Sequence, residues 1–237
     1  MPLSDETRAK LGTVSVATIC TALYKRGLSN QFIQDVHPVS GAGPMVGEAF
    51  TLRYMPARED LNGIEVFQDP KHPQRDAIER CPPGSVMVID SRRDPRAASA
   101  GSILVTRLMV RGCAGIVTDG GFRDAPEMAE MDFPIYHNRP SSPTNLTRHQ
   151  AIGINEPIGC GEAPVFPGDV IVGDAEGVVV IPAQMADEIA AEAVEMTAFE
   201  DFVTEEVQAG RSIIGLYPAT HEQTRQDFAA WRAKNGR

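Results

Sequence analysis

Two short stretches of this chain combine the residue types that bind small anions and divalent cations. They are Gly101-Ser102-Ile103-Leu104 and Gly120-Gly121-Phe122-Arg123-Asp124. The first opens a predicted helix, and amides in the first turn of a helix donate hydrogen bonds outward, aided by the helix dipole. Because Gly101 also lets the backbone approach a ligand closely, we expect this turn to hold a carboxylate.

Arg123 and Asp124 supply the charged groups of the predicted site. The Arg123 guanidinium is planar, permanently charged and shaped to bind a carboxylate. Asp124 offers hard oxygen ligands suited to Mg²⁺ or Mn²⁺. Side by side they could neutralise each other, but neighbouring side chains in an extended loop usually point apart, so we expect each to be free. The alternative is a solvated surface pair beside glycines that only make tight turns.

A carboxylate site beside a divalent cation suits the chemistry of 2-oxo acids. The metal would bind the carboxylate and keto oxygens and stabilise the enolate formed when the adjacent carbon bond breaks, as in aldolases and decarboxylases. A lysine Schiff base could serve instead, but every lysine lies in a segment predicted to be exposed. The lysines are Lys10, Lys25, Lys71 and Lys234. The metal route is therefore favoured.

Other polar residues near the two stretches have less specific roles. Asp119 and Glu127 are candidates for outer groups that orient water on the metal, although Glu127 is equally a partner for the dipole of a following helix. Ser102 can be simply a helix N-cap. Asp174 is interpreted as a hairpin-turn residue. The histidines show no paired spacing, and we assign them no role.

The overall composition limits the partners that can be expected. With 32 acidic and 22 basic residues the formal charge is −10, which repels nucleic acid and anionic membranes, so neither is an expected partner. A small anionic substrate must then be held by a local positive feature.

The cysteines are too far apart for a metal motif and are expected to be reduced core thiols. A polar N-terminus and the lack of a long apolar stretch indicate the cytoplasm.

The hydrophobic pattern predicts an α/β fold that brings the two stretches together. Residues 86–89 and 115–118 are continuous apolar runs typical of strands covered on both faces, and residues 102–111 between them have helical spacing. This is a β-α-β unit. Residues 133–136 repeat the strand pattern, and residues 165–181 predict a β-hairpin that suggests a second, antiparallel sheet.

The remaining segments are mostly helical or polar. Ser4 and Ser15 can begin two N-terminal helices, residues 183–207 predict a long amphipathic helix that is a candidate oligomer surface, and residues 221–237 predict a terminal helix. Segments 1–40 and 56–73 are expected to shape specificity. The length of 237 residues favours one domain.

Residues 101–104, 111–124 and 173–182 together resemble the RraA-like family over about residues 15–217. That family includes the 4-hydroxy-4-methyl-2-oxoglutarate and 4-carboxy-4-hydroxy-2-oxoadipate aldolases, which also decarboxylate oxaloacetate, and the regulator of ribonuclease E activity. The resemblance implies a three-layer β/β/α, swivelling-domain-like single domain over residues 1–237. Its core would span residues 15–217, with a helical extension over residues 218–237.

The resemblance also implies an assembly and residue roles. It implies a homotrimer or homohexamer with the site at a subunit interface. In the family's aldolases the arginine matching Arg123 contacts substrate, and the aspartate matching Asp124 binds magnesium or manganese. Amides matching residues 101–104 hold the pyruvate carboxylate. An acidic residue of a neighbouring subunit takes part, and Glu200 is its candidate match.

One position departs from the aldolases of that family. Where they carry an acidic residue, this chain has Ser102, which cannot act as a carboxylate base. Asp119 could replace it, or the reaction could be a different one on a 2-oxo or sugar acid. The main alternative is a protein without catalytic activity that binds and modulates a partner such as a ribonuclease. The intact pair of Arg123 and Asp124 favours the enzyme.

Overall fold

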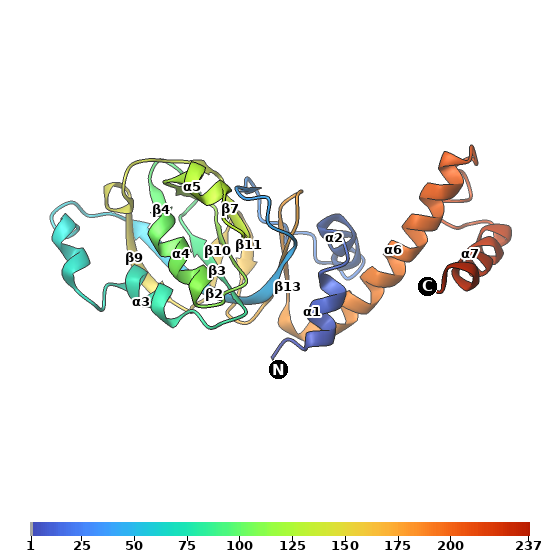
Figure 1. Cartoon of the computed structure of the whole chain (residues 1–237), viewed down its shortest axis with the longest axis horizontal. Helices are drawn as coiled ribbons and strands as arrows, with labels where there is room; N and C mark the ends of the chain where they lie inside the picture. Colours follow the sequence, from blue (N-terminus) through green and yellow to red (C-terminus); the bar gives the residue numbers. More distant parts are fainter. Residues whose placement is uncertain (1) are drawn as a thin grey trace.

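A computed structural model describes residues 2–237, built around one large mixed β-sheet (Figure 1). The strand order is β1-β7-β5-β3-β2-β12-β13, and β9 also pairs with β2. These strands are β1 (His37–Pro38), β2 (Met45–Pro56), β3 (Ser85–Asp90), β5 (Gly115–Thr118), β7 (Ile135–His137), β9 (His149–Ile154), β12 (Val170–Gly173) and β13 (Val178–Ile181). Strands β2, β3, β5 and β7 are parallel, and the other pairings are antiparallel. The predicted α/β class is confirmed.

The central strand β3 is buried on both faces, as its unbroken apolar run predicted. Successive side chains of a strand point to opposite faces, and the core follows this alternation. Met87 and Ile89 belong to a hydrophobic cluster on one face, while Val86 and Val88 belong to a second cluster on the other. The sheet therefore has a covered layer on each side.

Helices cover the sheet in two groups. The first group, α3 (Pro73–Arg80), α4 (Ser102–Val110) and α5 (Ala125–Ala129), contributes to the cluster that contains Met87 and Ile89. The second group, α1 (Asp5–Leu11), α2 (Val16–Tyr24) and α6 (Ala186–Gln208), packs near β13. The predicted caps Ser4 and Ser15 begin α1 and α2, each accepting a hydrogen bond from an amide of the first turn.

Two small sheets complete the body. Strands β4 (Ala98–Ala100), β6 (Gly121–Phe122) and β8 (Arg139–Pro140) form a parallel sheet, and β10 (Ile158–Cys160) pairs with β11 (Ala163–Val165). The hairpin predicted within residues 165–181 is β12–β13, but it does not form a second sheet. Strand β12 pairs with β2 and extends the main sheet, and the separate antiparallel pair is β10–β11. Hydrophobic spacing locates a hairpin without showing which edge it joins.

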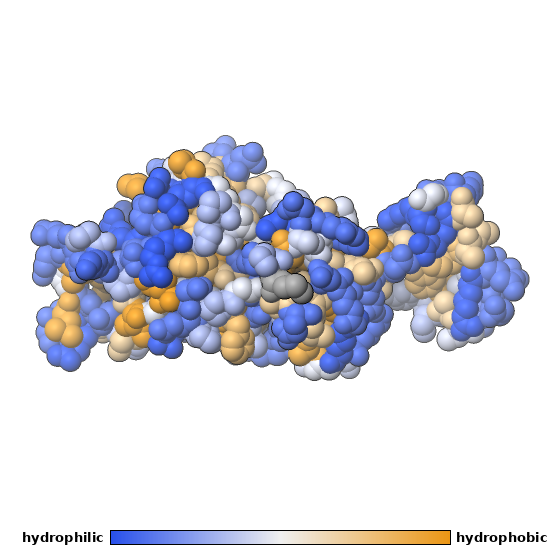
Figure 2. Space-filling view, turned by 90° about the horizontal axis from the view of Figure 1, so that it is seen from below, coloured by the Kyte–Doolittle hydropathy of each residue, from blue (hydrophilic) through white to orange (hydrophobic). Residues whose placement is uncertain are grey.

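The C-terminal region forms an arm that projects from the body (Figure 1). Helix α7 (Glu222–Asn235), the predicted terminal helix, folds back on the outer end of α6. An aromatic cluster of Phe199, Phe202, Phe228 and Trp231 joins them. Within residues 2–237 no helix is long and apolar enough to cross a membrane. In Figure 2 hydrophilic residues dominate the face shown, and hydrophobic ones form separate patches.

The cysteines are free thiols, and three of them, Cys81, Cys113 and Cys160, are buried as expected. Cys20 on α2 differs because it is only partly buried.

Candidate active site

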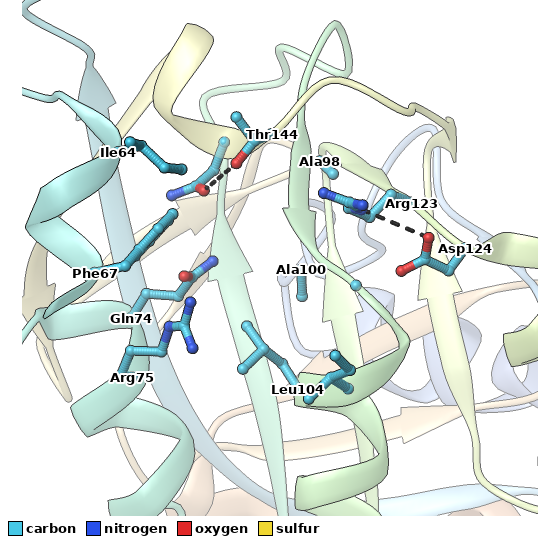
Figure 3. Close-up of a pocket in the computed structure, with 13 residues that line it drawn as sticks. Ile64, Phe67, Gln74, Arg75, Ala98, Ala100, Leu104, Arg123, Asp124 and Thr144 are labelled. Carbon is cyan, nitrogen blue, oxygen red and sulfur yellow. Dashed lines mark hydrogen bonds and ion pairs between the residues drawn. The ribbon is translucent and has the colours of Figure 1, made fainter. Parts of the chain in front are cut away.

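A cavity of about 480 Å³ lies beside the small parallel sheet, between α4 and α3 (Figure 3). One end is made by the turn at Gly101 together with Arg123 and Asp124. The opposite wall comes from α3 and from two short 3-10 helices, η1 (Ile64–Gln68) and η2 (Asn145–Thr147). The lining residues are Ile64, Phe67, Gln74, Arg75, Ala98, Ala100, Gly101, Ile103, Leu104, Arg123, Asp124, Thr144 and Asn145.

The two stretches singled out in the sequence meet at one end of this cavity. Strands β4 and β6 pair in parallel with Ala100 opposite Phe122, and the amide of Arg123 donates to the carbonyl of Ala100 at 3.1 Å. The turn after β4 therefore lies against the turn after β6. A Cβ atom on Gly101 would lie 2.8 Å from the Asp124 carboxylate and 3.0 Å from Cγ of Arg123. Only glycine allows this approach.

Asp124 adopts a left-handed backbone conformation, with φ of 60° and ψ of 31°. Aspartate tolerates this region better than most residues, although such a conformation costs about 1–3 kcal/mol and is concentrated at functional sites. The turn directs the carboxylate back toward α4, where Oδ2 accepts hydrogen bonds from the amide of Ser102 at 3.1 Å and its hydroxyl at 3.4 Å. The Asp124 side chain thus caps the N-terminus of α4, although it comes from a different segment of the chain.

Arg123 and Asp124 do not point apart as predicted. Their charged groups approach, with Nε of Arg123 3.5 Å from Oδ1 of Asp124, because the left-handed turn brings consecutive side chains to the same side. The pair is nevertheless open to solvent, with 50% of the Arg123 side chain and 32% of the Asp124 side chain exposed. An exposed ion pair is worth about 1 kcal/mol or less, so a ligand can replace it.

The amides at the start of α4 are less available than the sequence suggested. The N-cap is Gly101 rather than Ser102, and the amide of Ser102 is already bonded to Asp124. The amide of Leu104 donates to the carbonyl of Gly101 at 3.1 Å. The amides of Gly101 and Ile103 have no hydrogen-bond partner in the described part of the chain, and Ile103 N–H in the first turn of α4 is a donor that the turn can offer to a ligand.

Asp119, proposed as an outer group, lies in a different environment. It is 1% exposed, does not line the cavity, and accepts hydrogen bonds from the amides of Ser91, Arg93 and Gly161 at 2.7, 3.0 and 3.2 Å. Burial raises the pKa of the Asp119 carboxyl to about 6, although these amides favour the charged form. Its contacts are those of a structural group that fixes the loop after β3.

The other two outer candidates are also absent from the cavity lining. Glu127 is an exposed residue of α5 whose amide donates to the carbonyl of Asp124 at 3.1 Å. Glu200 lies on α6, where its carboxylate accepts from the hydroxyls of Thr18 at 2.9 Å and Tyr217 at 3.4 Å. Neither side chain meets Asp124 within the same chain.

The wall opposite Arg123 was not predicted. Arg75 lies over the ring of Phe67, with its guanidinium carbon 4.6 Å from the ring centroid, and Ile64 lies beside them (Figure 3). Residues 56–73 were expected to shape specificity, and Ile64 and Phe67 come from that segment. Segment 1–40 contributes no residue of its described part to the lining. Helical spacing could have located α3, but nothing local indicates that it faces the turn at Gly101.

Among the residues that the structure describes, Asp124 is the only acidic one that lines the cavity. Residues 2–237 contain no group of three or more His, Cys, Asp or Glu side chains placed to hold a metal. Magnesium often binds through one or two carboxylates and takes its remaining oxygens from water and substrate. The donor set therefore fits a hydrated ion held by Asp124 and a chelating substrate, and it does not fit a closed structural site.

Comparison with known proteins identifies the family. Residues 16–180 match the RraA-like family, described as Aldolase/RraA. The chain belongs to the RraA-like family. It is 32% identical over 169 residues to a protein of Halalkalibacterium halodurans named "Putative 4-hydroxy-4-methyl-2-oxoglutarate aldolase", which covers 71% of this chain and 73% of the relative. The resemblance stated from the sequence is confirmed.

Solved structures show the same fold. Streptomyces coelicolor RraAS2, described as an unusual member of the RNase ES inhibitor RraA protein family, aligns with a TM-score of 0.75 and 28% identity over 85% of this chain and 97% of that one. An uncharacterized protein from Pseudomonas syringae aligns with a TM-score of 0.77 and 22% identity, covering 92% and 99%. The proteins similar to this chain thus include one whose printed name is that of a putative aldolase and one described as a member of an inhibitor family.

Proposed function

We propose that this RraA-like protein is a lyase that depends on Mg²⁺ or Mn²⁺ and breaks a carbon–carbon bond in small 2-oxo acids. The observation that carries the proposal is the convergence of the Arg123 guanidinium, the Asp124 carboxylate and the free amide of Ile103 on one end of one cavity. These are a binder for a carboxylate, a ligand for a cation and a hydrogen-bond donor. The aldolase name of the Halalkalibacterium relative supports the same reaction class.

Each residue has a distinct role in this proposal. Arg123 binds the substrate carboxylate, and the amide of Ile103 fixes its orientation. Asp124 would hold the divalent cation, which supplies stabilisation for the negative charge that develops on the 2-oxo oxygen as the adjacent bond breaks. Asp124 must give up its weak contacts with Arg123 and the Ser102 hydroxyl to do so, and both are long enough, at 3.5 and 3.4 Å, to be lost at small cost.

The proposed site draws a further acidic residue from a neighbouring subunit of a trimer or hexamer, with Glu200 as the candidate. Glu200 lies on α6, and the outer end of this helix projects from the body (Figure 1), which supports a contact of α6 with another chain. A subunit-mixing experiment tests this sharing. Asp124→Ala and Glu200→Ala subunits, each inactive alone, should regain part of the activity when mixed. No recovery in confirmed mixed oligomers would remove Glu200 from the site.

The reaction itself is tested with oxaloacetate as substrate and Mg²⁺ or Mn²⁺ as cofactor, with pyruvate release as the readout. Asp124→Ala should lower kcat/KM by about 100- to 1000-fold, the range expected when one group that stabilises transition-state charge is removed. Asp132→Ala is the matched control, because Asp132 is an exposed carboxylate outside the cavity lining. Wild-type activity in the Asp124→Ala protein would rule out this role.

A second candidate function is regulation of a protein partner without catalysis. Ser102 favours it, since the family's aldolases resemble this chain but carry an acidic residue there, and RraAS2 belongs to a described inhibitor family. The same oxaloacetate assay separates the two functions. No pyruvate release with either metal, together with a stable complex with an RNase E-type ribonuclease, would favour the regulator.

A further inference from the structure

Two of the buried cysteines, Cys81 and Cys113, lie side by side at the ends of neighbouring helices. Helices α3 and α4 pack against each other (Figure 1), and Cys81 is the C-cap of α3. The Sγ atom of Cys113 lies 3.8 Å from the carbonyl oxygen of Cys81 and 3.6 Å from that of Pro82. Both side chains belong to one hydrophobic cluster. The fold therefore brings together two thiols that are 32 positions apart in the sequence.

The backbone at the end of α4 holds Cys113 in place. The amide of Gly112 donates to the carbonyl of Met109 at 2.9 Å, and the amide of Cys113 donates to that of Leu108 at 3.1 Å. These two bonds are the Schellman motif, in which Gly112 supplies the left-handed residue with a φ of 78°. Cys113 is thus fixed relative to the helix that it follows.

The turn after α3 is joined to this motif by two further backbone hydrogen bonds. The amide of Gly84 donates to the carbonyl of Gly112 at 2.7 Å, and the amide of Ala114 donates to that of Ser85 at 2.8 Å. Bonds on both sides of one cysteine therefore keep it next to the turn that begins with the other.

The Cys113 thiol is the more reactive of the two. A hydrogen bond with the Cys81 thiol and the nearby Arg111 guanidinium lower the pKa of Cys113, whereas that hydrogen bond and burial raise the pKa of Cys81. Cys113 is 8% exposed and Cys81 is fully buried. An accessible thiol that ionises readily is the form that peroxides oxidise.

Arg111 is placed to stabilise the Cys113 thiolate. Its Nη2 donates to the carbonyl of Cys81 at 3.2 Å, which holds the guanidinium beside the pair. Its Nε is buried and has no hydrogen-bond partner among residues 2–237. A buried donor without a partner is unfavourable, and a thiolate is an acceptor that could satisfy it.

We propose that Cys81 and Cys113 are a redox-active dithiol that hydrogen peroxide converts reversibly into a disulfide. The Cys113 thiolate attacks one peroxide oxygen, so that an S–O bond forms, the O–O bond breaks, and the leaving hydroxide takes a proton to become water. The Cys81 sulfur then attacks the sulfur of this sulfenic acid, loses its proton, and displaces the second oxygen as water. The two thiols are oxidised by two electrons, and the peroxide is reduced to two waters.

The disulfide would link the two helices that form opposite sides of the cavity. Gln74 and Arg75 of α3 and Leu104 of α4 line the cavity (Figure 3), and the cysteines lie at the other ends of these helices. A covalent link there limits the separation of the two walls. Because it also closes a long loop, the thermal midpoint of the oxidised chain should rise by about 5 °C or more.

Peptide mapping of the full chain tests the modification. Reduced protein is treated with hydrogen peroxide, the remaining thiols are alkylated, and the chain is digested without reductant. We expect a peptide pair linked through Cys81 and Cys113 that separates after treatment with dithiothreitol. Cys113→Ala should give no linked pair. Cys160→Ala is the matched control and should give the same pair as wild type, because Cys160 is a buried thiol of a different cluster.

A second pair of variants tests the role of Arg111. Arg111→Met should slow disulfide formation about 3- to 10-fold, because the thiolate loses its neighbouring cation. Arg107→Met is the control. Arg107 pairs with Glu79 at 2.8 Å, the carboxylate that Arg111 approaches at 3.6 Å, but within residues 2–237 it makes no hydrogen bond with Cys81 or Cys113. Its loss should leave the rate unchanged, and circular dichroism confirms that each variant is folded.

The wild-type protein alone can overturn the inference. Oxidation of Cys113 to sulfinic or sulfonic acid without a linked pair, a link between two chains, or no reaction of either thiol in the folded protein would each do so. A linked chain whose thermal midpoint does not rise would reject the constraint on α3 and α4. None of these outcomes depends on lyase activity, so the dithiol and the proposed reaction are tested separately.

Discussion

Asp119 and Asp124 follow β5 and β6, which are consecutive along the chain, and both accept hydrogen bonds from backbone amides, yet their surroundings differ. Asp119 is 1% exposed and is bonded to the amides of Ser91, Arg93 and Gly161. The side chain of Asp124 is 32% exposed and is bonded to one residue of another turn, Ser102. A carboxylate whose oxygens are fully used by buried amides supports the fold. One that keeps an open face toward a cavity can bind a ligand.

The largest expected effect comes from removing each carboxylate in turn. Asp119→Ala leaves two buried amides, of Ser91 and Gly161, and the part-buried amide of Arg93 without an acceptor. It should lower the free energy of unfolding by about 3 kcal/mol or more, at about 1–3 kcal/mol for each buried amide. Asp124→Ala should lower it by about 1 kcal/mol, the usual effect of losing a helix cap. Urea denaturation of both variants measures the difference. Similar losses would remove the distinction between the two positions.

The pH dependence of stability gives a second, smaller contrast. The pKa of Asp119 is raised by burial to about 6, from about 3.9 in an unfolded chain, so the folded state binds this proton more tightly. Its stabilising contribution is complete below about pH 4 and is lost as the pH rises to about 6, at up to about 1.4 kcal/mol per pH unit. Asp119→Asn, which cannot titrate, should lack this loss.

Two buried histidines act in the opposite sense over the same range. Burial lowers the pKa of His137 and His149 to about 4, so their contribution is present above about pH 6.5 and is lost as the pH falls. The measurement is therefore the difference between wild type and Asp119→Asn, from urea denaturation between pH 4 and 7. A difference that does not change with pH would show that Asp119 is ionised throughout.

The smallest expected effect tests the close approach of the two turns. In Gly101→Ala the new Cβ would meet the Asp124 carboxylate at 2.8 Å, and we expect a loss of about 1 kcal/mol or less in stability, because the carboxylate can shift away. Pyruvate release should fall as well, because Asp124 is displaced. Gly159→Ala is the control, since its Cβ would meet nothing within 4 Å. Equal behaviour of the two variants in thermal melts would show that the contact is unimportant.

The sequence predicted one half of the site better than the other. Local patterns located the strands at residues 86–89 and 115–118 and the helix between them. The turn at Gly101 meets Asp124 because β4 pairs with β6, and the sequence analysis predicted neither of these short strands. The wall with Arg75 and Asn145 depends on how α3 and η2 pack from distant parts of the chain. No periodicity of a single segment encodes that packing.

The sequence also did not predict the finer geometry of the site, namely the conformation of its turn and the burial of its carboxylates. The left-handed turn at Asp124 reverses the expected divergence from Arg123, and it depends on the contact with Ser102 rather than on the dipeptide alone. Burial separates Asp119 from Asp124, although the two carboxylates flank the same Gly120-Gly121 pair. The hairpin β12–β13 is part of the main sheet because β12 pairs with the free edge of β2.

Strand β2 has a consequence for how the chain reaches this structure. Its parallel neighbour β3 begins at Ser85, but its antiparallel neighbours β9 and β12 begin only at His149 and Val170. During synthesis one edge of β2 therefore stays unpaired until most of the chain has left the ribosome. Unpaired apolar edges are prone to association with other chains. Productive folding thus requires β9 and β12 to pair with this edge of β2 before another chain associates with it.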